Sequence, residues 1–430
     1  MHNAQCYIGE TTLSFKLSLP LSKSVRAREL VLDALAGKIV EVDEENDDIF
    51  VLSRALYNSQ FTIHNSQLSD QSDQSDVLDN SQLFIARGSK TFGSTFNSQL
   101  STFNLNASGT ALRFLTAYCA VSEGVFLLTG SKRLCERPIK PLVDALRGMG
   151  ASIEYVDKEG FAPLRIKGRK LKGGRVRLDA SLSSQFASAL MLISDKVEGG
   201  VEIEYEGDVA SKSYIRLTEK VIERYKRGVR YSGERDWSSA TVWYAAMAVL
   251  RKGRFLLEGL SLDSCQPDRA IVEVFEKLGV STMAMENGVV IESNDCVVDK
   301  LVLDCKNMPD AVMYIVVAAC LLGVDFEISG VETLRVKESD RIEVLINEMR
   351  KCGYPIQCTM HNAQCITHNA QCITHNAQCT DLVKIETYDD HRMAMAMAVV
   401  GLVMDVEIEN PEVVNKSYPE FWEEFNKIRS

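Results

Sequence analysis

Six stretches of the 430-residue chain open with hydroxyl, cationic or acidic side chains and continue into segments rich in Ala, Ser, Thr and Gly. Because Ser, Thr and Asp accept hydrogen bonds from the first N–H groups of a helix, these openings predict helix N-termini. Such termini bind anions, and arginine adds planar, bidentate recognition of carboxylate and phosphate. The chemistry indicated is the binding of one or two multiply charged anions. The stretches are 22–37, 108–120, 183–194, 237–250, 308–323 and 389–402.

The polar residues at or near these openings form one candidate site. Each opening also has an ordinary structural interpretation, since Ser108–Thr110 could simply cap a helix and 337–345 could be a capped surface helix. Lys337 and Arg341, however, carry like charges four residues apart and repel each other by a few tenths of a kcal/mol, which favours anion binding. The candidates are Ser22, Lys23, Ser24, Arg28, Ser108, Gly109, Thr110, Arg113, Ser183, Ser184, Gln185, Asp310, Lys337, Glu338, Arg341, Asp389, Asp390, His391 and Arg392.

A second possible centre is the unit His-Asn-Ala-Gln-Cys, which occurs three times within 358–380 and once at His2–Cys6. Imidazole and thiolate are common ligands of soft metals. A Cys/His zinc site uses spacings that fold into a tetrahedral knuckle, whereas this repeat copies whole units, including the Asn-Ala-Gln that binds no metal. The pattern therefore predicts a duplicated, tolerated insertion, and we expect no metal and no cofactor.

The elements that must position the candidate residues follow a repeated order of strand, buried helix, strand, amphipathic helix and further strands. Helices that are apolar on nearly all sides are buried ones. Six such α/β units predict two domains of three units each. The low-complexity regions 58–100 and 358–380 lack sustained periodicity and are predicted to be exposed loops or ragged hairpins. The predicted amphipathic helices are 136–151, 213–225, 266–280 and 339–353, with strands at 176–180, 201–205 and 300–304.

Composition restricts the class of protein. A hydrophobic share of 46% with 25% charged residues is typical of a globular protein, and no run of 18 apolar residues predicts a membrane span. The net charge of −11 argues against nucleic acid as a partner. The twelve cysteines stand mostly singly in apolar segments, which favours reduced thiols in the cytoplasm. The N-terminal stretch lacks a basic start followed by an apolar block, so we expect no signal peptide.

Nine motifs resemble, in order, those of the 5-enolpyruvylshikimate-3-phosphate synthase family: LSKSVRAR, ASGTALRFLTA, ERPIKPLVDALRGMGA, SSQFASALML, SCQPDRAI, MPDAVM, LRVKESDRI, YDDHRMAMA and NKSYPEFW. The resemblance covers nearly the whole chain outside the two low-complexity regions. It implies an α/β, two-domain enolpyruvyl transferase fold, an inverse α/β barrel of six repeated units with three per domain. One domain would span 21–235, on the shikimate 3-phosphate side, and the other 1–20 plus 236–430, with the active site in the cleft between them.

The resemblance also implies a reaction. The enolpyruvyl group of phosphoenolpyruvate would pass to the 5-hydroxyl of shikimate 3-phosphate, releasing phosphate, in the shikimate pathway to chorismate and aromatic amino acids. The protein would be a cytoplasmic monomer with these two small anions as its partners, without nucleic acid, membrane, metal or cofactor. Asp310 would be the base on the hydroxyl and Glu338 the proton donor to carbon, with Lys23 assisting. Since cations keep a carboxylate ionised, the donor role demands a compensating rise in pKa.

The matched motifs imply two sets of substrate-binding residues. Those for shikimate 3-phosphate are Lys23, Ser24, Arg28, Ser183, Ser184, Gln185, Ser211, Tyr214, Asp310 and Lys337. Those for phosphoenolpyruvate are Lys23, Gly109, Arg113, Arg137, Gln185, Arg341, Arg392 and Lys416.

Four positions depart from the family pattern, while the charged set is complete, so we expect activity. Leu21, Ala107, Ser213 and Thr333 stand where the family usually has Gly, Asn, Pro and Asn. Three alternatives remain open. The first is the related enolpyruvyl transferase that acts on a UDP-sugar, which lacks the combination of SSQF and KESDR found here. The others are an inactive paralogue and a non-catalytic metal-binding protein built around the repeated His-Asn-Ala-Gln-Cys unit.

Overall fold

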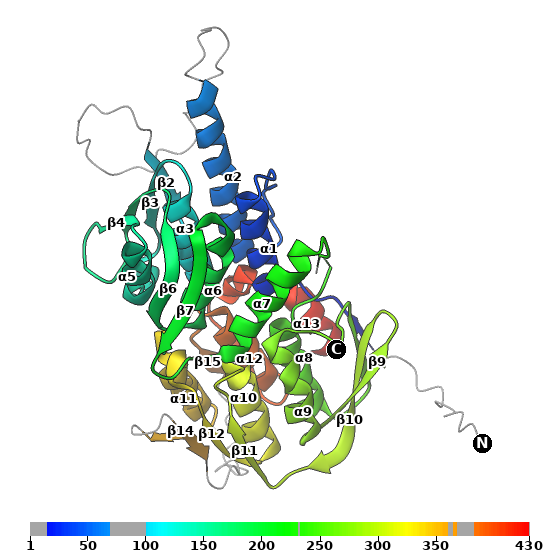
Figure 1. Ribbon diagram of the computed structural model, residues 1–430. Helices are drawn as coiled ribbons and strands as arrows, with labels where there is room; N and C mark the ends of the chain where they lie inside the picture. Colours follow the sequence, from blue (N-terminus) through cyan, green and yellow to red (C-terminus); the bar gives the residue numbers. More distant parts are fainter. Residues whose placement is uncertain (1–14, 69–99, 231–232, 360–363, 368–381, 430) are drawn as a thin grey trace.

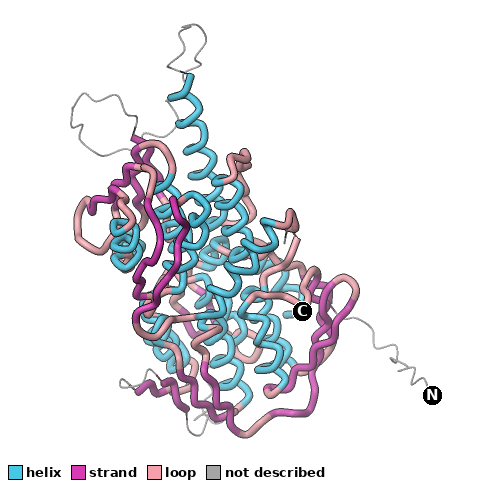
Figure 2. Tube along the Cα trace, viewed as in Figure 1, coloured by secondary structure: helices cyan, strands magenta, loops and turns pink. Residues whose placement is uncertain are grey.

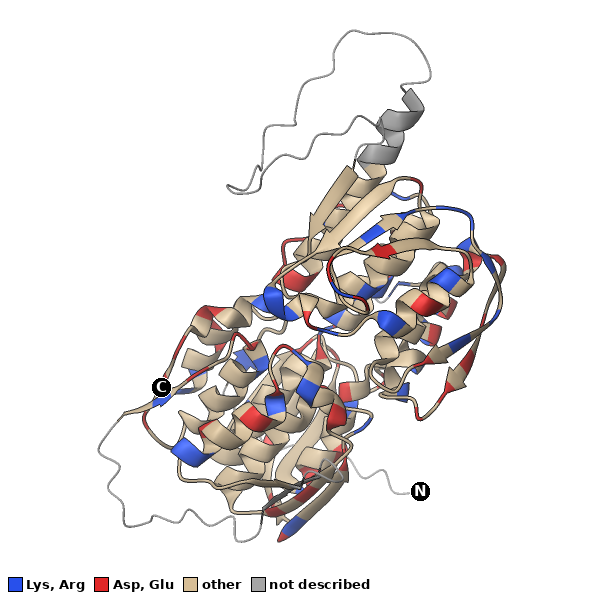
Figure 3. Ribbon diagram, turned by 90° about the vertical axis from the view of Figure 1, so that its left-hand side faces the viewer, with Lys and Arg blue, Asp and Glu red and all other residues tan. Residues whose placement is uncertain are grey.

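Two large apolar cores divide the protein. The computed structural model describes residues 15–68, 100–230, 233–359, 364–367 and 382–429. One core gathers side chains between Ala27 and Ile215, and the other gathers Leu17, Leu19 and side chains between Trp237 and Ile428. Figure 3 shows the corresponding two lobes, which we call the first and second lobe. The chain thus enters the second core briefly, builds the whole first core, and then returns.

Three four-stranded sheets share one connectivity. In each, the first two strands are parallel and the last two add antiparallel, which gives the order first, second, fourth, third. Parallel neighbours require a crossover. A helix supplies it in two of the sheets, whereas in the sheet that begins at Phe15 the whole first lobe and a helix lie between the two parallel strands. The strands are β2 (Leu100–Asn104), β3 (Val125–Thr129), β4 (Ser152–Tyr155) and β5 (Leu164–Lys167); β1 (Phe15–Leu17), β8 (Arg254–Glu258), β9 (Leu278–Met285) and β10 (Gly288–Val297); and β11 (Lys300–Asp304), β12 (Asp325–Ser329), β13 (Gln357–Thr359) and β14 (Gln364–Thr367).

Two shorter units consist of parallel strand pairs around a helix. They are β6 (Lys172–Asp179) with β7 (Glu198–Glu206), and β15 (Val383–Ile385) with β16 (Val406–Ile408). The remaining unit has, within the described residues, the helices α1 (Lys23–Leu35) and α2 (Asp47–Leu68) and no strand. The sixfold α/β repetition is therefore confirmed, with three of the six units reduced in their strands. Figure 2 shows helices gathered inside and strands along the outer faces.

Six inner helices correspond to the six predicted buried stretches. Within each lobe the three helices pack against one another. Small side chains permit the close packing of helices that are buried on nearly all sides, and α8 is buried from Trp237 to Ala248. The inner helices are α1, α3 (Gly109–Val121) and α6 (Ser184–Ile193) in the first lobe, and α8 (Trp237–Leu250), α10 (Val312–Leu322) and α12 (His391–Val400) in the second.

The outer helices match two of the four amphipathic predictions closely, while the helix predicted over 136–151 is shorter and spans Lys140–Gly148. The helix predicted over 266–280 ends early, because the chain enters strand β9 at Leu278 and the segment divides into a 3₁₀ turn and a short helix. The outer helices are α4 (Lys132–Cys135), α5 (Lys140–Gly148), α7 (Lys212–Lys226), α9 (Ile271–Glu276), α11 (Arg341–Lys351) and α13 (Phe421–Arg429), with 3₁₀ turns η1 (Ser194–Lys196), η2 (Pro267–Ala270), η3 (Pro309–Ala311), η4 (Glu332–Val336) and η5 (Pro411–Lys416).

The prediction of a loop over 58–100 is wrong at both ends of that range. Helix α2 begins at Asp47 and continues through Leu68, and Figure 1 shows it as the long helix at the top of the molecule. Ile49, Leu52 and Leu56 are buried at helical spacing, and the Ser59 hydroxyl bonds with that of Tyr118 at 3.0 Å. A helix once nucleated extends at little cost through residues of modest propensity. Strand β2 begins at Leu100, and residues 69–99 lie outside the described part.

The loop predicted over 358–380 is wrong for its first part, where the alternative of a hairpin is confirmed. Strands β13 and β14 pair antiparallel, with Cys358 opposite Cys365, and β14 also pairs with β12. Backbone groups supply these ladders, so a repetitive sequence can still form them. Most of the repeated His-Asn-Ala-Gln-Cys units lie outside the described residues.

The two passages of the chain between the lobes lie side by side. Leu21 and Arg235 form an isolated antiparallel bridge. The Ser22 N–H donates to the Glu234 carbonyl at 2.8 Å, and the Asp236 N–H donates to the Pro20 carbonyl at 3.0 Å. Among the described helices, none is both long and apolar enough to cross a membrane.

A buried carboxylate fixes the turn that precedes α12. Tyr388 and Asp389 both have left-handed backbones, with φ of 53° and 54°, which non-glycine residues seldom adopt. The fully buried Glu348 of α11 accepts hydrogen bonds from the Tyr388 hydroxyl at 2.8 Å and the Glu386 N–H at 3.3 Å. Since Asp390 caps α12, this turn sets where α12 begins.

We expect Tyr388→Phe to lower the free energy of unfolding by about 1.5–3 kcal/mol, because it removes a hydrogen bond to a buried charged group. The matched control is Tyr205→Phe on the exposed part of β7, where the change should stay within about 0.5 kcal/mol. Urea denaturation followed by circular dichroism measures both. Equal effects of the two substitutions would contradict this role of Tyr388.

Candidate active site

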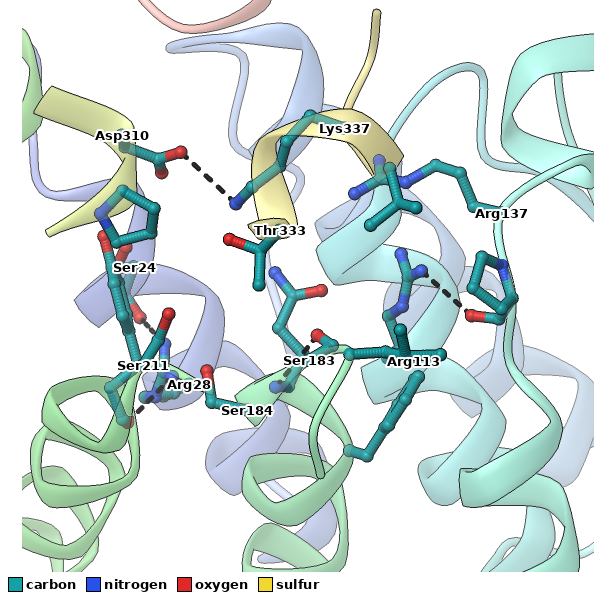
Figure 4. A pocket seen from close by; sticks show the side chains of 17 residues that line it. Ser24, Arg28, Arg113, Arg137, Ser183, Ser184, Ser211, Asp310, Thr333 and Lys337 are labelled. Atoms are coloured by element: carbon teal, nitrogen blue, oxygen red, sulfur yellow. Dashed lines mark hydrogen bonds and ion pairs between the residues drawn. The ribbon is translucent and has the colours of Figure 1, made fainter. Parts of the chain in front are cut away.

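Both lobes contribute walls to a polar pocket where they meet (Figure 4). It brings together eleven of the residues predicted from the sequence, with Thr333, Pro138 and Val336 beside them. The first lobe provides Ser24, Arg28, Arg113, Arg137, Ser183, Ser184, Gln185, Ser211 and Tyr214, and the second lobe provides Asp310 and Lys337.

Helix starts in the first lobe present hydroxyl and amide groups to this pocket. The Ser183 hydroxyl caps α6 by accepting from the Gln185 N–H at 3.2 Å, and the Gln185 side chain donates to the Thr110 hydroxyl at 2.9 Å. Ser211 lies at the start of α7 with a left-handed backbone, φ 51°, and its side chain forms no capping hydrogen bond. The Ser211 hydroxyl is therefore not used in holding the helix.

Arg28 is a buried cation held by neutral groups. Its guanidinium donates to the Thr218 hydroxyl at 2.8 Å, the Ser24 carbonyl at 2.6 Å and the Ser188 hydroxyl at 3.3 Å. Burial lowers the pKa of Arg28 to about 10, so the group stays charged at neutral pH. No carboxylate of the described residues forms an ion pair with it. Such a cation suits a site that binds an anion.

Arg113 and Arg137 lie close together with unsatisfied N–H groups. Arg113 donates to the carbonyls of Gly109 at 2.9 Å and Pro138 at 3.2 Å. Nε of Arg113 and both Nε and Nη1 of Arg137 are buried and have no hydrogen-bond partner among the described residues. Burial and the charge of Arg137 hold the pKa of Arg113 well below its usual range. A Cβ at Gly109 would lie 2.4 Å from Arg113 Nη1 and 2.5 Å from Arg137 Nη1, so a side chain there would displace both guanidinium groups.

In the second lobe, Arg341 joins three carboxylates from separate segments. It lies 2.9 Å from Asp310, 2.8 Å from Glu338 and 2.8 Å from Asp390. Asp390 also accepts from the Ser339 hydroxyl at 3.0 Å and from the Arg392 N–H at 3.0 Å. This buried ion network holds the starts of α10, α11 and α12 together.

Asp310 and Glu338 are both ionised in this network. Burial alone would raise the pKa of Asp310, but Arg392 at 3.2 Å and Lys337 at 3.3 Å outweigh burial and hold it well below the usual value. For Glu338, burial is likewise outweighed by Lys416 at 2.9 Å and by Arg341, so its pKa is also held well below the usual value. The carboxylate expected to donate a proton therefore begins as a proton acceptor.

Six of the residues to which the resemblance gives a role lie beside the pocket and not among those that line it. Arg341, Arg392 and Lys416 belong to the ion network, and Glu338 is also 3.8 Å from Arg137. Lys23 pairs with Asp48 at 2.8 Å; burial lowers its pKa, but Asp48 outweighs burial, so the pKa is raised and Lys23 is charged. The six are Lys23, Gly109, Glu338, Arg341, Arg392 and Lys416.

Two acidic groups near the site received no role from the sequence. Asp48 lies in the acidic run from Asp43 to Asp48, and no spacing connects it to Lys23. Asp268 belongs to the matched motif SCQPDRAI, and that motif could have indicated a role for it. It accepts from the hydroxyls of Ser238 and Tyr214, and burial together with the charge of Asp310 raises the pKa of Asp268 to about 6.

The four departures from the family pattern lie where the lobes meet. Leu21 is in the crossing bridge, and Thr333 lines the pocket. The Ala107 carbonyl accepts from Lys416 Nζ at 3.3 Å, which links the lobes through the backbone. The Ser213 hydroxyl donates to the Asn307 carbonyl at 2.6 Å, a bond that proline could not form.

The one histidine of the matched motifs is neutral. His391 is buried at the start of α12, and burial together with the charge of Lys23 holds its pKa well below its usual range. Within the part of the chain that is described, no three His, Cys, Asp or Glu side chains group closely enough to hold a metal ion. The predicted absence of a metal at the repeated His-Asn-Ala-Gln-Cys units concerns residues outside that part, so it stays a prediction.

Comparisons with known proteins agree with the motifs. The model of the family described as EPSP synthase (3-phosphoshikimate 1-carboxyvinyltransferase) matches residues 9–425. The chain is 34% identical to the 3-phosphoshikimate 1-carboxyvinyltransferase of Bacteroides fragilis, over 96% of this chain and 94% of that protein. It is 36% identical to the protein of the same name from Syntrophobacter fumaroxidans, over 96% of this chain and 97% of that protein.

The fold has solved counterparts as well. EPSP synthase from Acinetobacter baumannii matches with a TM-score of 0.62 and 19% sequence identity, covering 97% of this chain and 96% of that one. At that identity the likeness shows the fold alone, whereas the family match and the curated relatives extend over nearly the whole sequence. The chain therefore belongs to the EPSP synthase family.

Proposed function

We propose that this protein transfers the enolpyruvyl group of phosphoenolpyruvate to the 5-hydroxyl of shikimate 3-phosphate and releases phosphate. The observation that carries the proposal is the set of cations without full partners at the pocket. Nε and Nη1 of Arg137 and Nε of Arg113 are buried without hydrogen bonds among the described residues, and Arg28 is held by neutral groups. Each unsatisfied buried donor costs about 1–3 kcal/mol, which an anionic ligand would recover.

The charges of the two substrates match this site. Their phosphates carry about −1.5 to −2 each, and each substrate has a carboxylate, which gives roughly six negative charges. The cations that would meet them come from both lobes, so binding would draw the lobes together. They are Lys23, Arg28, Arg113, Arg137, Lys337, Arg341, Arg392 and Lys416.

The two substrates would occupy neighbouring parts of the site. Shikimate 3-phosphate would lie against the hydroxyl-rich wall and Arg28, with Lys337 and Asp310 opposite. Phosphoenolpyruvate would lie between Arg113 and Arg137 on one side and the ion network on the other. The first set is Lys23, Ser24, Arg28, Ser183, Ser184, Gln185, Ser211, Tyr214, Asp310 and Lys337; the second is Lys23, Gly109, Arg113, Arg137, Gln185, Arg341, Arg392 and Lys416.

The carboxylates would move the protons. Asp310 is ionised, as a base must be, and substrate anions that draw charge from Lys337 and Arg392 would raise its pKa and its basicity. Glu338 would take up a proton when phosphoenolpyruvate competes for Lys416 and Arg137, and then deliver it to the methylene carbon. Lys23 would assist by stabilising the negative charge of the phosphate.

The domain organisation and setting follow the same proposal. Residues 21–235 would form one domain and residues 1–20 plus 236–430 the other, supported by the two cores and by the paired crossings at Leu21 and Arg235. The acidic balance and the single cysteines, of which four of the eight described are buried, support a cytoplasmic protein that binds neither nucleic acid nor membrane. A site completed by the two lobes of one chain supports a monomer.

We expect the purified protein to release phosphate only when both substrates are present, and Lys23→Met to lower turnover by several orders of magnitude. A coupled phosphate assay with mass analysis of the product measures both. Turnover of a UDP-sugar in place of shikimate 3-phosphate would favour the related transferase, and absence of turnover with either acceptor would favour an inactive paralogue.

The ion pair between Lys23 and Asp48 calls for a control, because Lys23→Met leaves a buried carboxylate unpaired. The double variant Lys23→Met with Asp48→Asn removes both charges and isolates the loss of the lysine. It should be as inactive as the single variant. Recovery of turnover in the double variant would show that the single substitution acts only through Asp48.

We expect substrate binding to raise the pKa of Glu338, so that the wild type takes up more protons on binding than Glu338→Gln does. The sign follows from the site, because anions that compete for Lys416 and Arg137 weaken the cations that hold that pKa low. Calorimetric titrations at pH 7 in buffers of different ionisation enthalpy give the proton count. Equal counts for the two proteins would exclude Glu338 as the group that gains the proton.

We expect replacement of His361, His368 and His375 by Asn and of Cys365, Cys372 and Cys379 by Ser to leave turnover within about twofold. Every residue assigned a role lies elsewhere in the chain, and the backbone ladder of β14 does not depend on these side chains. Substitution is preferable to deletion, which would remove β14. A large loss of activity, or its loss on treatment with a chelator, would favour the metal-binding alternative.

A further inference from the structure

Arg133 reaches from the first lobe to three backbone carbonyls of the second. Its Nε donates to the Glu338 carbonyl at 3.0 Å and to the Lys337 carbonyl at 3.2 Å, and its Nη2 donates to the Arg335 carbonyl at 3.3 Å. Arg133 does not line the pocket of Figure 4, but it lines a neighbouring cavity together with Arg137 and Glu338. Its hydrogen bonds to the second lobe are therefore with the backbone of the segment that carries two candidate site residues.

The segment that receives these bonds has little regular structure of its own. The 3₁₀ turn η4 ends at Val336, and α11 is capped by Asp340, so residues 337–339 lie in neither element. Lys337 has an extended backbone, with φ −82° and ψ −158°. Its side chain reaches Asp310, while that of the adjacent Glu338 reaches Lys416 and Arg341. A small rotation of this backbone would move both side chains.

Arg133 is itself firmly placed. Leu134, the next residue of α4, is buried, and the Ser131 hydroxyl caps α4 at the Leu134 N–H at 3.2 Å. The Ser131 N–H donates to the Asn106 carbonyl at 2.7 Å. A Cβ at Gly130 would lie 2.4 Å from the Leu134 side chain and 2.6 Å from the Asn106 carbonyl, so the turn into α4 is closely packed. The guanidinium thus extends from a fixed support.

An ordinary surface ion pair does not explain this arrangement. Arg133 also lies near Glu136, but at 3.8 Å and with both side chains substantially exposed, a geometry that contributes little. The planar guanidinium, in contrast, presents donors in two directions and bonds with all three carbonyls. Arg137, four residues later, approaches the Glu338 carboxylate from the same lobe at 3.8 Å. The first lobe therefore approaches both the backbone carbonyl and the side-chain carboxylate of Glu338.

We propose that Arg133 is a positioning residue, which fixes the backbone of residues 335–338 from the opposite lobe and so aims Lys337 and Glu338 at the substrates. The inference rests on the proposed function for what Lys337 and Glu338 do. Because Arg133 lies on one lobe and its acceptors on the other, the correct aim is reached only when the lobes are together. Proton delivery by Glu338 is thereby tied to closure over both substrates.

We expect Arg133→Gln to lower kcat by about 10- to 100-fold, since misplacement of a reacting group by about 1 Å has effects of that size. The KM values of both substrates should change by less than about threefold, because the residues that line the pocket remain. Arg133→Lys should recover only part of the loss, since an ammonium group cannot present the two directed donors.

Two neighbours provide matched controls. Lys132→Gln removes a cation from the same short helix, and Glu136→Gln removes the partner of the surface ion pair. Both should stay within about twofold of wild-type kcat. If either control lost as much activity as Arg133→Gln, or if Arg133→Gln kept kcat within twofold in an active wild-type background, the positioning role would be overturned.

Amide hydrogen exchange tests the contact without relying on turnover. Peptides covering 333–341 should exchange at least about tenfold faster in Arg133→Gln than in the wild type or in Lys132→Gln, while peptides from the inner helices stay unchanged. Unchanged exchange over 333–341 would overturn the inference whether or not the protein turns over the proposed substrates. An inactive wild type with accelerated exchange in Arg133→Gln would refute the proposed function and leave the positioning contact supported.

Discussion

The buried guanidinium of Arg341 is the interaction on which the second lobe's part of the site depends. It joins Asp310, Glu338 and Asp390, which enter from the starts of three different helices. Removing charges from water is costly, and breaking one partner of such a network is more costly still, because it leaves a buried charge unpaired. The network therefore specifies one arrangement of α10, α11 and α12, and with it the places of Arg392, Lys337 and Lys416.

The arginines of the two lobes have different partners, although Lys23 of the first lobe is paired with Asp48. In the second lobe each cation near the site has a carboxylate partner, as Lys416 has Glu338 and Arg392 has Asp310. In the first lobe Arg28 and Arg113 are held by hydroxyl groups and carbonyls. In the proposed function, the uncompensated cations would attract the substrate anions, and the paired carboxylates would become available as proton carriers once those anions draw their cations away. Neither lobe alone has both properties.

Sequence reasoning succeeded where one local signal determined the outcome. Apolar stretches rich in small residues, each with capping residues near its start, predicted all six inner helices to within a few residues. It failed where a partner distant in the sequence decides. The Ser59 hydroxyl inside α2 forms a hydrogen bond with the hydroxyl of Tyr118, and Asp48 belongs to the site because it forms an ion pair with Lys23. Nothing in the sequence around Arg133 indicated its role, because its acceptors are backbone carbonyls of the other lobe, whose position the sequence does not reveal.

The position of the repeated His-Asn-Ala-Gln-Cys tract within its α/β unit explains why the fold tolerates it. The helix starts carry the candidate site residues, while the hairpins that close each four-stranded sheet lie at its outer edge. Strand β14 lies between β12 and β13 and contributes backbone hydrogen bonds, which any non-proline sequence can supply. The first residue of the ion network after this tract is Asp390. The hydrogen bond between Tyr388 and Glu348 fixes the turn that precedes it. Because that anchor comes from α11 and not from the preceding tract, added sequence between β13 and β15 leaves the start of α12 where the ion network requires it.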